Sequence, residues 1–173
     1  MEAGLLIIRV AVGVIMFYHG TEKLFGWWGG EGVGGAAEFF GRQGYRAPRL
    51  TAAVAGLTES AGGLLLAAGL LTPLGAVMLI GVFVNIMILH LPNGLSRRRN
   101  GCEYELVLMA ATCCIAFTGP GTAAADGALG LDLNGAGWGG AVTAIGVLSG
   151  LAVSASRARS RRPGSRTVRA EAG

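Results

Sequence analysis

Six polar side chains interrupt long apolar stretches of this sequence, and they are the residues best placed to do chemistry. They are Arg9, His19, Glu59, Asn85, His90 and Glu103. Ionisable groups in apolar surroundings are costly and normally face a partner, a ligand or a water-filled cavity. We therefore take all six as candidate ligand-binding residues, and the sequence assigns none of them a catalytic role.

The deepest members of this set are Arg9, Glu59 and Asn85. A helix rises about 1.5 Å per residue, which places Glu59 and Asn85 near the middle of their apolar stretches and Arg9 about 9 Å below the surface. A long arginine side chain can bridge that offset, so we expect Arg9 and Glu59 to form a buried ion pair. Such a pair could be purely structural, or Glu59 could face a ligand.

A second set, formed by His19, His90, Glu103 and Glu105, lies near the other ends of the apolar stretches. Imidazoles and carboxylates are suited to proton handling or to contacts with a ligand head group. The alternative is a set of hydrogen bonds that pin helix ends. We expect no metal, because no H-x-x-x-H or E-x-x-H spacing occurs on one helix. Without a C-x-x-C motif, the three cysteines fit helix packing better than disulfide exchange.

The elements that must position these residues are five apolar stretches, at residues 3–25, 50–71, 74–91, 104–117 and 138–154. The chain is 52% hydrophobic and 14% charged, which is outside the range of ordinary soluble domains. A membrane span needs about 20 apolar residues, so the first two stretches are long enough and the last three are marginal. The predicted fold class is an all-α membrane protein, with a four-helix transmembrane bundle plus a fifth transmembrane helix.

The basic residues predict how these stretches cross the membrane. If the chain crosses five times, 13 of its 14 Lys and Arg residues fall on one side, and Arg9 alone lies within a span. Lys and Arg accumulate on the cytoplasmic side, so we expect the N-terminus outside and the C-terminus in the cytoplasm. A bacterial cell (inner) membrane fits this pattern. The Arg-rich tail is expected to be disordered or to lie against anionic lipid, and no nucleic-acid partner is expected.

Several short motifs together resemble those of the DoxX family of small bacterial membrane proteins. Those in the first half of the chain are RVAVG at 9–13, FYHG at 17–20, KLF at 23–25, LTESAGGLLL at 57–66 and GLLTP at 69–73. Those in the second half are His90, GCEYEL at 101–106, TGPG at 118–121 and LD at 131–132. Residues 122–130 separate the Gly-Pro-Gly turn from Asp132 by more than the family pattern does, which leaves the role of Asp132 open.

Hydrophobicity and charge predict a fifth transmembrane helix at 134–156 and a disordered cytoplasmic tail at 157–173, both of which lie beyond the usual four-helix core of the family. The resemblance implies a DoxX-like four-helix transmembrane bundle at 1–133. It also implies an integral membrane subunit of an oxidoreductase, or of a thiol and oxidative-stress defence system. A quinone-like or other amphiphilic molecule is the candidate ligand. The expected partners are the lipid bilayer and soluble redox proteins on the cytoplasmic side. The alternatives are a non-enzymatic membrane scaffold that docks such proteins and, with less support because no inverted repeat is seen, a small transporter.

Overall fold

The computed structural model describes residues 2–157, and most of this part of the chain is helical. The long helices are α1 (Glu2–Phe25), α3 (Pro48–Ala68), α4 (Thr72–His90), α5 (Glu103–Thr118) and α7 (Ala136–Ala155). The short ones are η1 (Trp27–Gly29), α2 (Gly32–Arg42), η2 (Leu91–Asn93), η3 (Arg97–Arg99) and α6 (Ala125–Ala128). The predicted all-α fold class is therefore confirmed. The predicted tail lies, except for Arg157, outside the described residues.

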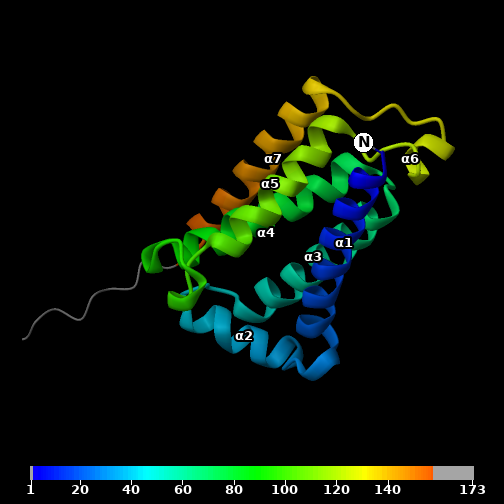
Figure 1. Ribbon diagram of the computed structural model, residues 1–173. Coiled ribbons are helices and arrows are strands. Elements are labelled where there is room, and N and C mark those ends of the chain that lie inside the picture. Colours follow the sequence, from blue (N-terminus) through cyan, green and yellow to red (C-terminus); the bar gives the residue numbers. More distant parts are fainter. Residues whose placement is uncertain (1, 158–173) are drawn as a thin grey trace, which may run out of the picture.

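The long helices form two layers that come together at one end of the molecule (Figure 1). In the first layer α1 packs along α3, and in the second α4 packs against both α7 and α5. The tight turn between α3 and α4 links the two layers. Helix α2 contacts α1 and α3, and it lies across the end of the bundle where the layers diverge (Figure 1).

Glycines bring α1 and α3 into backbone contact. A side chain at Gly13 would collide with the carbonyl of Gly63, and a side chain at Gly20 would collide with Ser60. Small residues at facing positions are a common means of close helix packing in membranes. These contacts fix the register of α1 against α3, and that register decides which polar residues of the two helices meet.

Four helices are long and apolar enough to cross a membrane: α1, α3, α4 continued to Asn93, and α7. The fifth apolar stretch therefore forms α7, which packs closely on α4 where Gly146 meets Ile80. Helix α5 has 16 residues and is about 24 Å long. Its first turn contacts His90 at the end of α4, and the loop after its last turn contacts the start of α1 at Pro120. Despite its shortness, α5 thus reaches from one end of the bundle to the other.

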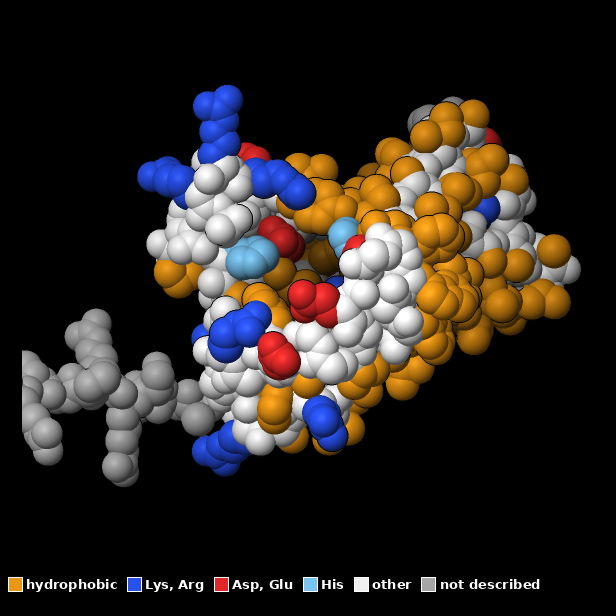
Figure 2. All heavy atoms as spheres, turned by 90° about the horizontal axis from the view of Figure 1, so that it is seen from below, with side chains coloured by type: hydrophobic (Ala, Val, Ile, Leu, Met, Phe, Trp, Pro, Cys, Tyr) orange, Lys and Arg blue, Asp and Glu red, His pale blue; other side chains and the backbone are white. Residues whose placement is uncertain are grey.

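The outward faces of the long helices are apolar. Exposed side chains include Ile7, Val14, Leu57, Leu64, Val107 and Leu148. Figure 2 shows hydrophobic side chains gathered over one side of the visible face, apart from the charged ones. Such a surface is too extensive for a soluble monomer and is suited to lipid. The chain is a multi-pass membrane protein in contact with the bilayer, as predicted.

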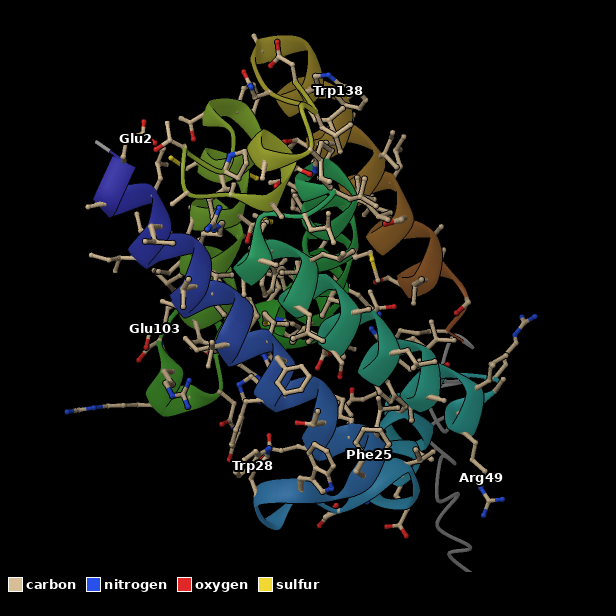
Figure 3. All side chains as sticks on the ribbon, turned by 90° about the vertical axis from the view of Figure 1, so that its right-hand side faces the viewer. Glu2, Phe25, Trp28, Arg49, Glu103 and Trp138 are labelled. Carbon is tan, nitrogen blue, oxygen red and sulfur yellow. The ribbon has the colours of Figure 1, made fainter. Side chains whose placement is uncertain are left out.

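Basic residues distinguish the two ends of the bundle. Apart from Arg9, the described Lys and Arg residues belong to the end where α2 lies, here called the α2 end: Lys23, Arg42, Arg46, Arg49, Arg97, Arg98, Arg99 and Arg157. Figure 3 places Glu2 and Trp138 at the other end, here called the Glu2 end, and Trp28 and Arg49 at the α2 end. Exposed tryptophans at both ends fit the interfacial belts of a membrane protein.

Candidate functional site

A cavity of about 730 Å³ opens at the α2 end of the bundle. Its apolar lining includes Met16, Phe40, Phe83, Ile86 and Leu108. Its ionisable lining includes His19, Lys23, Glu59, His90 and Glu105. Figure 2 looks into this end and shows a hollow with both histidine side chains and acidic groups around it. A pocket of this size, with an apolar lining and a few polar groups, is typical of small-molecule sites.

The most buried ionisable group of the cavity is Glu59 in the middle of α3, whose side chain is 1% exposed. One carboxylate oxygen, Oε2, accepts a hydrogen bond from Lys23 Nζ at 2.6 Å. Lys23 Nζ also lies 3.4 Å from the carbonyl of His19, one turn earlier on α1. The other carboxylate oxygen, Oε1, is buried and has no hydrogen-bond partner among the described residues. Glu59 thus carries an ion pair on one side and an unsatisfied acceptor on the other.

The predicted ion pair between Arg9 and Glu59 is wrong. The helix register places Gly20 of α1 against Ser60 of α3, so Glu59 lies beside the last turns of α1. Arg9 is 14 residues before Lys23, which is about 21 Å along the helix. The counter-charge of Glu59 is therefore the lysine at the end of α1.

Two histidines each contact a carboxylate around the cavity. His90 Nδ1 lies 3.1 Å from Glu105 Oε1, joining the end of α4 to the first turn of α5. His19 Nδ1 lies 3.1 Å from Glu22 Oε2, and His19 Nε2 lies 3.4 Å from the Tyr104 hydroxyl. A carboxylate that contacts Nδ1 fixes the orientation and tautomer of an imidazole. The structure therefore brings together three of the six residues predicted from the sequence: His19, Glu59 and His90.

Glu103, another predicted candidate, faces solvent outside the cavity. Its Oε1 accepts a hydrogen bond from the backbone N–H of Arg97 at 2.9 Å. That bond closes the turn between η3 and α5, and the carboxylate lies in the first turn of α5, where negative charge is favoured. The contact accounts for Glu103 without any ligand.

Asn85, the fifth candidate, joins three segments of the bundle. Its Oδ1 accepts hydrogen bonds from the Tyr45 hydroxyl and from Ser154 Oγ, the latter at 3.0 Å. Burial raises the pKa of Tyr45, which keeps the phenol protonated and able to donate. Arg157 extends this contact, because its Nε donates to the carbonyl of Gln43 at 2.9 Å. Asn85 therefore fastens α7 to the segment between α2 and α3 and lies outside the cavity.

Comparison with known proteins agrees with this architecture. The DoxX family model matches residues 4–91, which include α1 to α4 and most of the cavity's ionisable groups. The chain belongs to the DoxX family. It is also 30% identical over 122 residues to a Bacillus subtilis (strain 168) protein named "Putative oxidoreductase CatD", covering 68% of this chain and 81% of that protein. No solved structure matches this DoxX protein.

The sixth candidate, Arg9, lies at the Glu2 end of this DoxX protein. Its guanidinium donates to the carbonyl of Pro120 at 2.9 Å through Nη1 and to that of Ala123 at 2.6 Å through Nη2. Asp126 lies three residues beyond Ala123 in the same part of the chain. The Asp126 carboxylate in turn accepts the backbone N–H groups of Leu71 and Thr72, at 2.6 and 2.9 Å. Arg9 and Asp126 therefore fasten the segment after α5 to α1 and to the start of α4, and we call these two residues the clasp.

The polar residues of the DoxX cavity that are absent from the six sequence candidates include Lys23, Tyr104 and Glu105, and the sequence held a signal for Lys23. Lys23 follows His19 by four residues, so both side chains point from the same face of α1. Tyr104 carried no such signal, because its hydroxyl reaches the cavity only through the packing of α5 against α1. Within residues 2–157, no cluster of three His, Cys, Asp or Glu side chains is arranged to hold a metal ion.

Proposed function

We propose that this DoxX protein is the membrane subunit of an oxidoreductase system, and that its cavity binds the head group of a quinone-like ligand. The observation that carries the proposal is the Glu59–Lys23 pair, buried beside an apolar wall with one carboxylate oxygen unpartnered. Polar groups buried in this way are costly and are usually retained where they meet a ligand. The name of the Bacillus subtilis relative supports the redox assignment.

The shape of the cavity supports an amphiphilic ligand. Phe83 and Leu108 offer an apolar surface to a ring, while Lys23, Glu59 and His90 offer charge and hydrogen bonds to its oxygens. The cavity opens where the basic residues and Trp28 lie, which is the interfacial end of the bundle. A head group could therefore enter from the interface while its tail stays in lipid. The proposal assigns ligand binding to these residues and no catalytic step.

Filling the cavity tests this proposal. We expect Ile86→Trp, which adds an indole to the wall of the cavity, to lower the quinone content of the purified protein at least about fivefold, because a well-packed site tolerates little added volume. The measurement is solvent extraction of protein purified from membranes, followed by chromatography of the extracted quinones.

The matched control is Ile7→Trp, the same substitution on a side chain that is 67% exposed on the outer face of α1. It should leave the quinone content unchanged. Two results would remove the support for a ligand in this cavity. One is equal quinone content in wild type and Ile86→Trp, and the other is no bound quinone in any of the proteins after reconstitution with a short-chain quinone.

A second candidate function is a membrane scaffold that docks soluble proteins. The observation in its favour is the exposed basic surface of the α2 end, which includes Arg97, Arg98 and Arg99 on one turn. Such a surface suits an acidic partner protein. If neutralising these three arginines releases a co-purifying redox protein while Ile86→Trp does not, docking is the better description of the function.

We further propose that the α2 end faces the cytoplasm of a bacterial cell, because Lys and Arg accumulate on that side. Reporter fusions after Phe25 and after Leu95 should then give cytoplasmic signals. Fusions near Thr72 and near Asp126 should report the opposite side, because both positions lie at the Glu2 end. A cytoplasmic signal at Asp126 would contradict this topology.

A further inference from the structure

The two layers of the bundle are joined differently at their two ends. At the Glu2 end they are held together by the tight turn between α3 and α4 and by the hydrogen bonds of Arg9 and Asp126. At the α2 end they diverge, and the cavity lies between them, lined by α1 and α3 on one side and by α4 and α5 on the other (Figure 1). The width of the cavity therefore depends on the contacts that join the layers at this end.

Four residues at the α2 end form such a contact between the layers. The Tyr45 hydroxyl and Ser154 Oγ both donate to Asn85 Oδ1, the latter at 3.0 Å. Arg157 Nε donates to the carbonyl of Gln43 at 2.9 Å, and its guanidinium carbon lies 5.8 Å from the centre of the Tyr45 ring. We call Tyr45, Asn85, Ser154 and Arg157 the latch. It connects the segment between α2 and α3 to α4 and to the end of α7.

The latch acts on the cavity through α2 and the residue that follows it. Phe40 and Gln43 line the cavity, whereas the four latch residues lie behind its wall. The rings of Phe40 and Tyr45 are both buried and pack edge to face, with their centres 5.1 Å apart. Gln43 is held directly by Arg157. The latch thus determines where this wall of the cavity stands relative to α4.

Helix α2 needs such contacts to keep its position. It has 11 residues, and a helix of this length is not stable by itself in water. Glycines with positive φ flank it on both sides, at 69° for Gly26, 64° for Gly32 and 86° for Gly44. Glycine adopts these conformations at little cost, and hinges are formed by a few residues at the ends of elements. The position of α2 is therefore set by its packing on α1 and α3 and by the latch.

We infer that the latch positions α2 and Gln43 as one wall of the cavity and thereby controls how firmly the cavity holds its ligand. A wall fixed before binding saves the cost of ordering it when the ligand binds, which favours affinity. Ser154 and Arg157 lie outside residues 4–91, the part that the family model matches, so the inference gives α7 a role in the site. It rests on the proposed function and names positioning residues that do not touch the ligand.

Two variants that each remove one hydroxyl test this inference. Tyr45→Phe keeps the ring against Phe40, and Ser154→Ala changes the end of α7 alone. Full-length protein loaded with decylubiquinone is immobilised in detergent and washed, and the quinone that remains is measured over time, with Ile86→Trp as the background for micelles. We expect dissociation to be about fivefold faster in each variant, because one hydrogen bond contributes about 1 kcal/mol.

Hydrogen exchange measures the latch itself, without ligand. The backbone N–H groups of Gln43, Gly44 and Tyr45 each donate to a carbonyl of α2, so they exchange only when this segment opens. In both variants we expect exchange at these three amides to be about fivefold faster than in the wild type, for the same reason.

Three control variants separate positioning from other effects. Ser156→Ala makes the same change two residues later, where the residue is exposed and its hydroxyl donates to the carbonyl of Val153 in the preceding turn. It should change neither rate. Ser154→Thr keeps the hydroxyl and should stay close to wild type. Asp126→Asn lowers stability at the opposite end of the bundle and should also leave both rates unchanged.

Several results would overturn the inference. Unchanged dissociation in Tyr45→Phe and Ser154→Ala would do so even if exchange is faster. Faster dissociation without faster exchange would show that the latch does not hold this wall. Equal acceleration in Asp126→Asn would assign the effect to overall stability. Ser154→Ala keeps the test valid should Tyr45→Phe fail to fold. If the wild type binds no decylubiquinone, the proposed function fails, and the inference fails with it.

Discussion

Replacing Lys23 by Met is expected to lower the free energy of unfolding by about 3–5 kcal/mol, because the Glu59 carboxylate is then buried without a counter-charge. The side chain of Glu59 is 1% exposed, so water solvates the carboxylate poorly once the ammonium is removed. A loss of this size is a large fraction of the stability of a small domain.

The opposite substitution, Glu59→Met, should cost less. The side chain of Lys23 is 26% exposed, and a lysine can bend its stem to keep the ammonium in water. The double variant, with Met at both positions, should recover most of the loss caused by Lys23→Met, because apolar residues of similar size often replace a buried pair without penalty. We therefore expect Lys23→Met to have the lowest free energy of unfolding of the three variants. Glu59→Met and the double variant should both be more stable than Lys23→Met.

Thermal unfolding in one detergent, followed for all three variants, gives the coupling between the two residues. The matched control is Arg42→Met, whose side chain is 68% exposed and only 3.7 Å from Glu38. It should change the free energy of unfolding by less than about 1 kcal/mol, as for most surface ion pairs. Additive losses, or a greater loss in Glu59→Met than in Lys23→Met, would show that burial of the carboxylate does not dominate this pair.

Much of the fold could be predicted from the sequence because hydrophobicity and charge act over whole segments. The apolar stretches at 3–25 and 50–71 correspond closely to α1 and α3. The stretch at 138–154 corresponds to α7, as the charge pattern required. Three of the six candidate residues also meet in one cavity, since polar groups in an apolar helix avoid lipid and turn toward the interior.

The pairing of charges could not be predicted, because counting residues along a helix gives the depth of a side chain in the membrane but not the register of one helix against another. The depth of Glu59 allowed either Arg9 or Lys23 as its partner. The contacts of Gly13 and Gly20 with α3 determine the partner, because they set the register of α1 so that its last turns lie beside Glu59. Arg9 was misassigned for a second reason. Its acceptors are backbone carbonyls in the loop after α5. Every residue has such a carbonyl, so the sequence does not show which ones accept from Arg9.

Breaking the clasp at the Glu2 end is expected to have an effect as large as that of Lys23→Met. Arg9 is 2% exposed and Asp126 is also 2% exposed. Arg9→Met would remove two charge-assisted hydrogen bonds and leave the carbonyls of Pro120 and Ala123 without their donors. The expected loss in the free energy of unfolding is about 3–5 kcal/mol, because each hydrogen bond made by a charged group contributes about 1.5–3 kcal/mol. Arg9→Lys should recover only part of it, because an ammonium cannot reproduce the planar fork of donors.

The other half of the clasp offers the best matched pair of variants in the chain. Asp126→Asn keeps the shape of a side chain that accepts from Leu71 and Thr72 at the start of α4, but it removes the charge that the helix N-terminus favours. The expected cost is about 1.5–3 kcal/mol, that of hydrogen bonds to a charged group.

Asp132→Asn makes the same chemical change six residues later, where the side chain is exposed and accepts one hydrogen bond within residues 2–157, from Asn134. Its free energy of unfolding should stay within about 0.5 kcal/mol of that of the wild type.

Thermal unfolding of both variants in one detergent, with the quinone content measured in parallel, separates stability from ligand binding. Because the clasp lies at the opposite end from the cavity, folded Asp126→Asn protein should keep its ligand. Equal stability of the two variants would show that the carboxylate of Asp126 does not hold α4 to the loop after α5. Loss of the ligand in a folded Asp126→Asn protein would show instead that the two ends of the bundle are coupled.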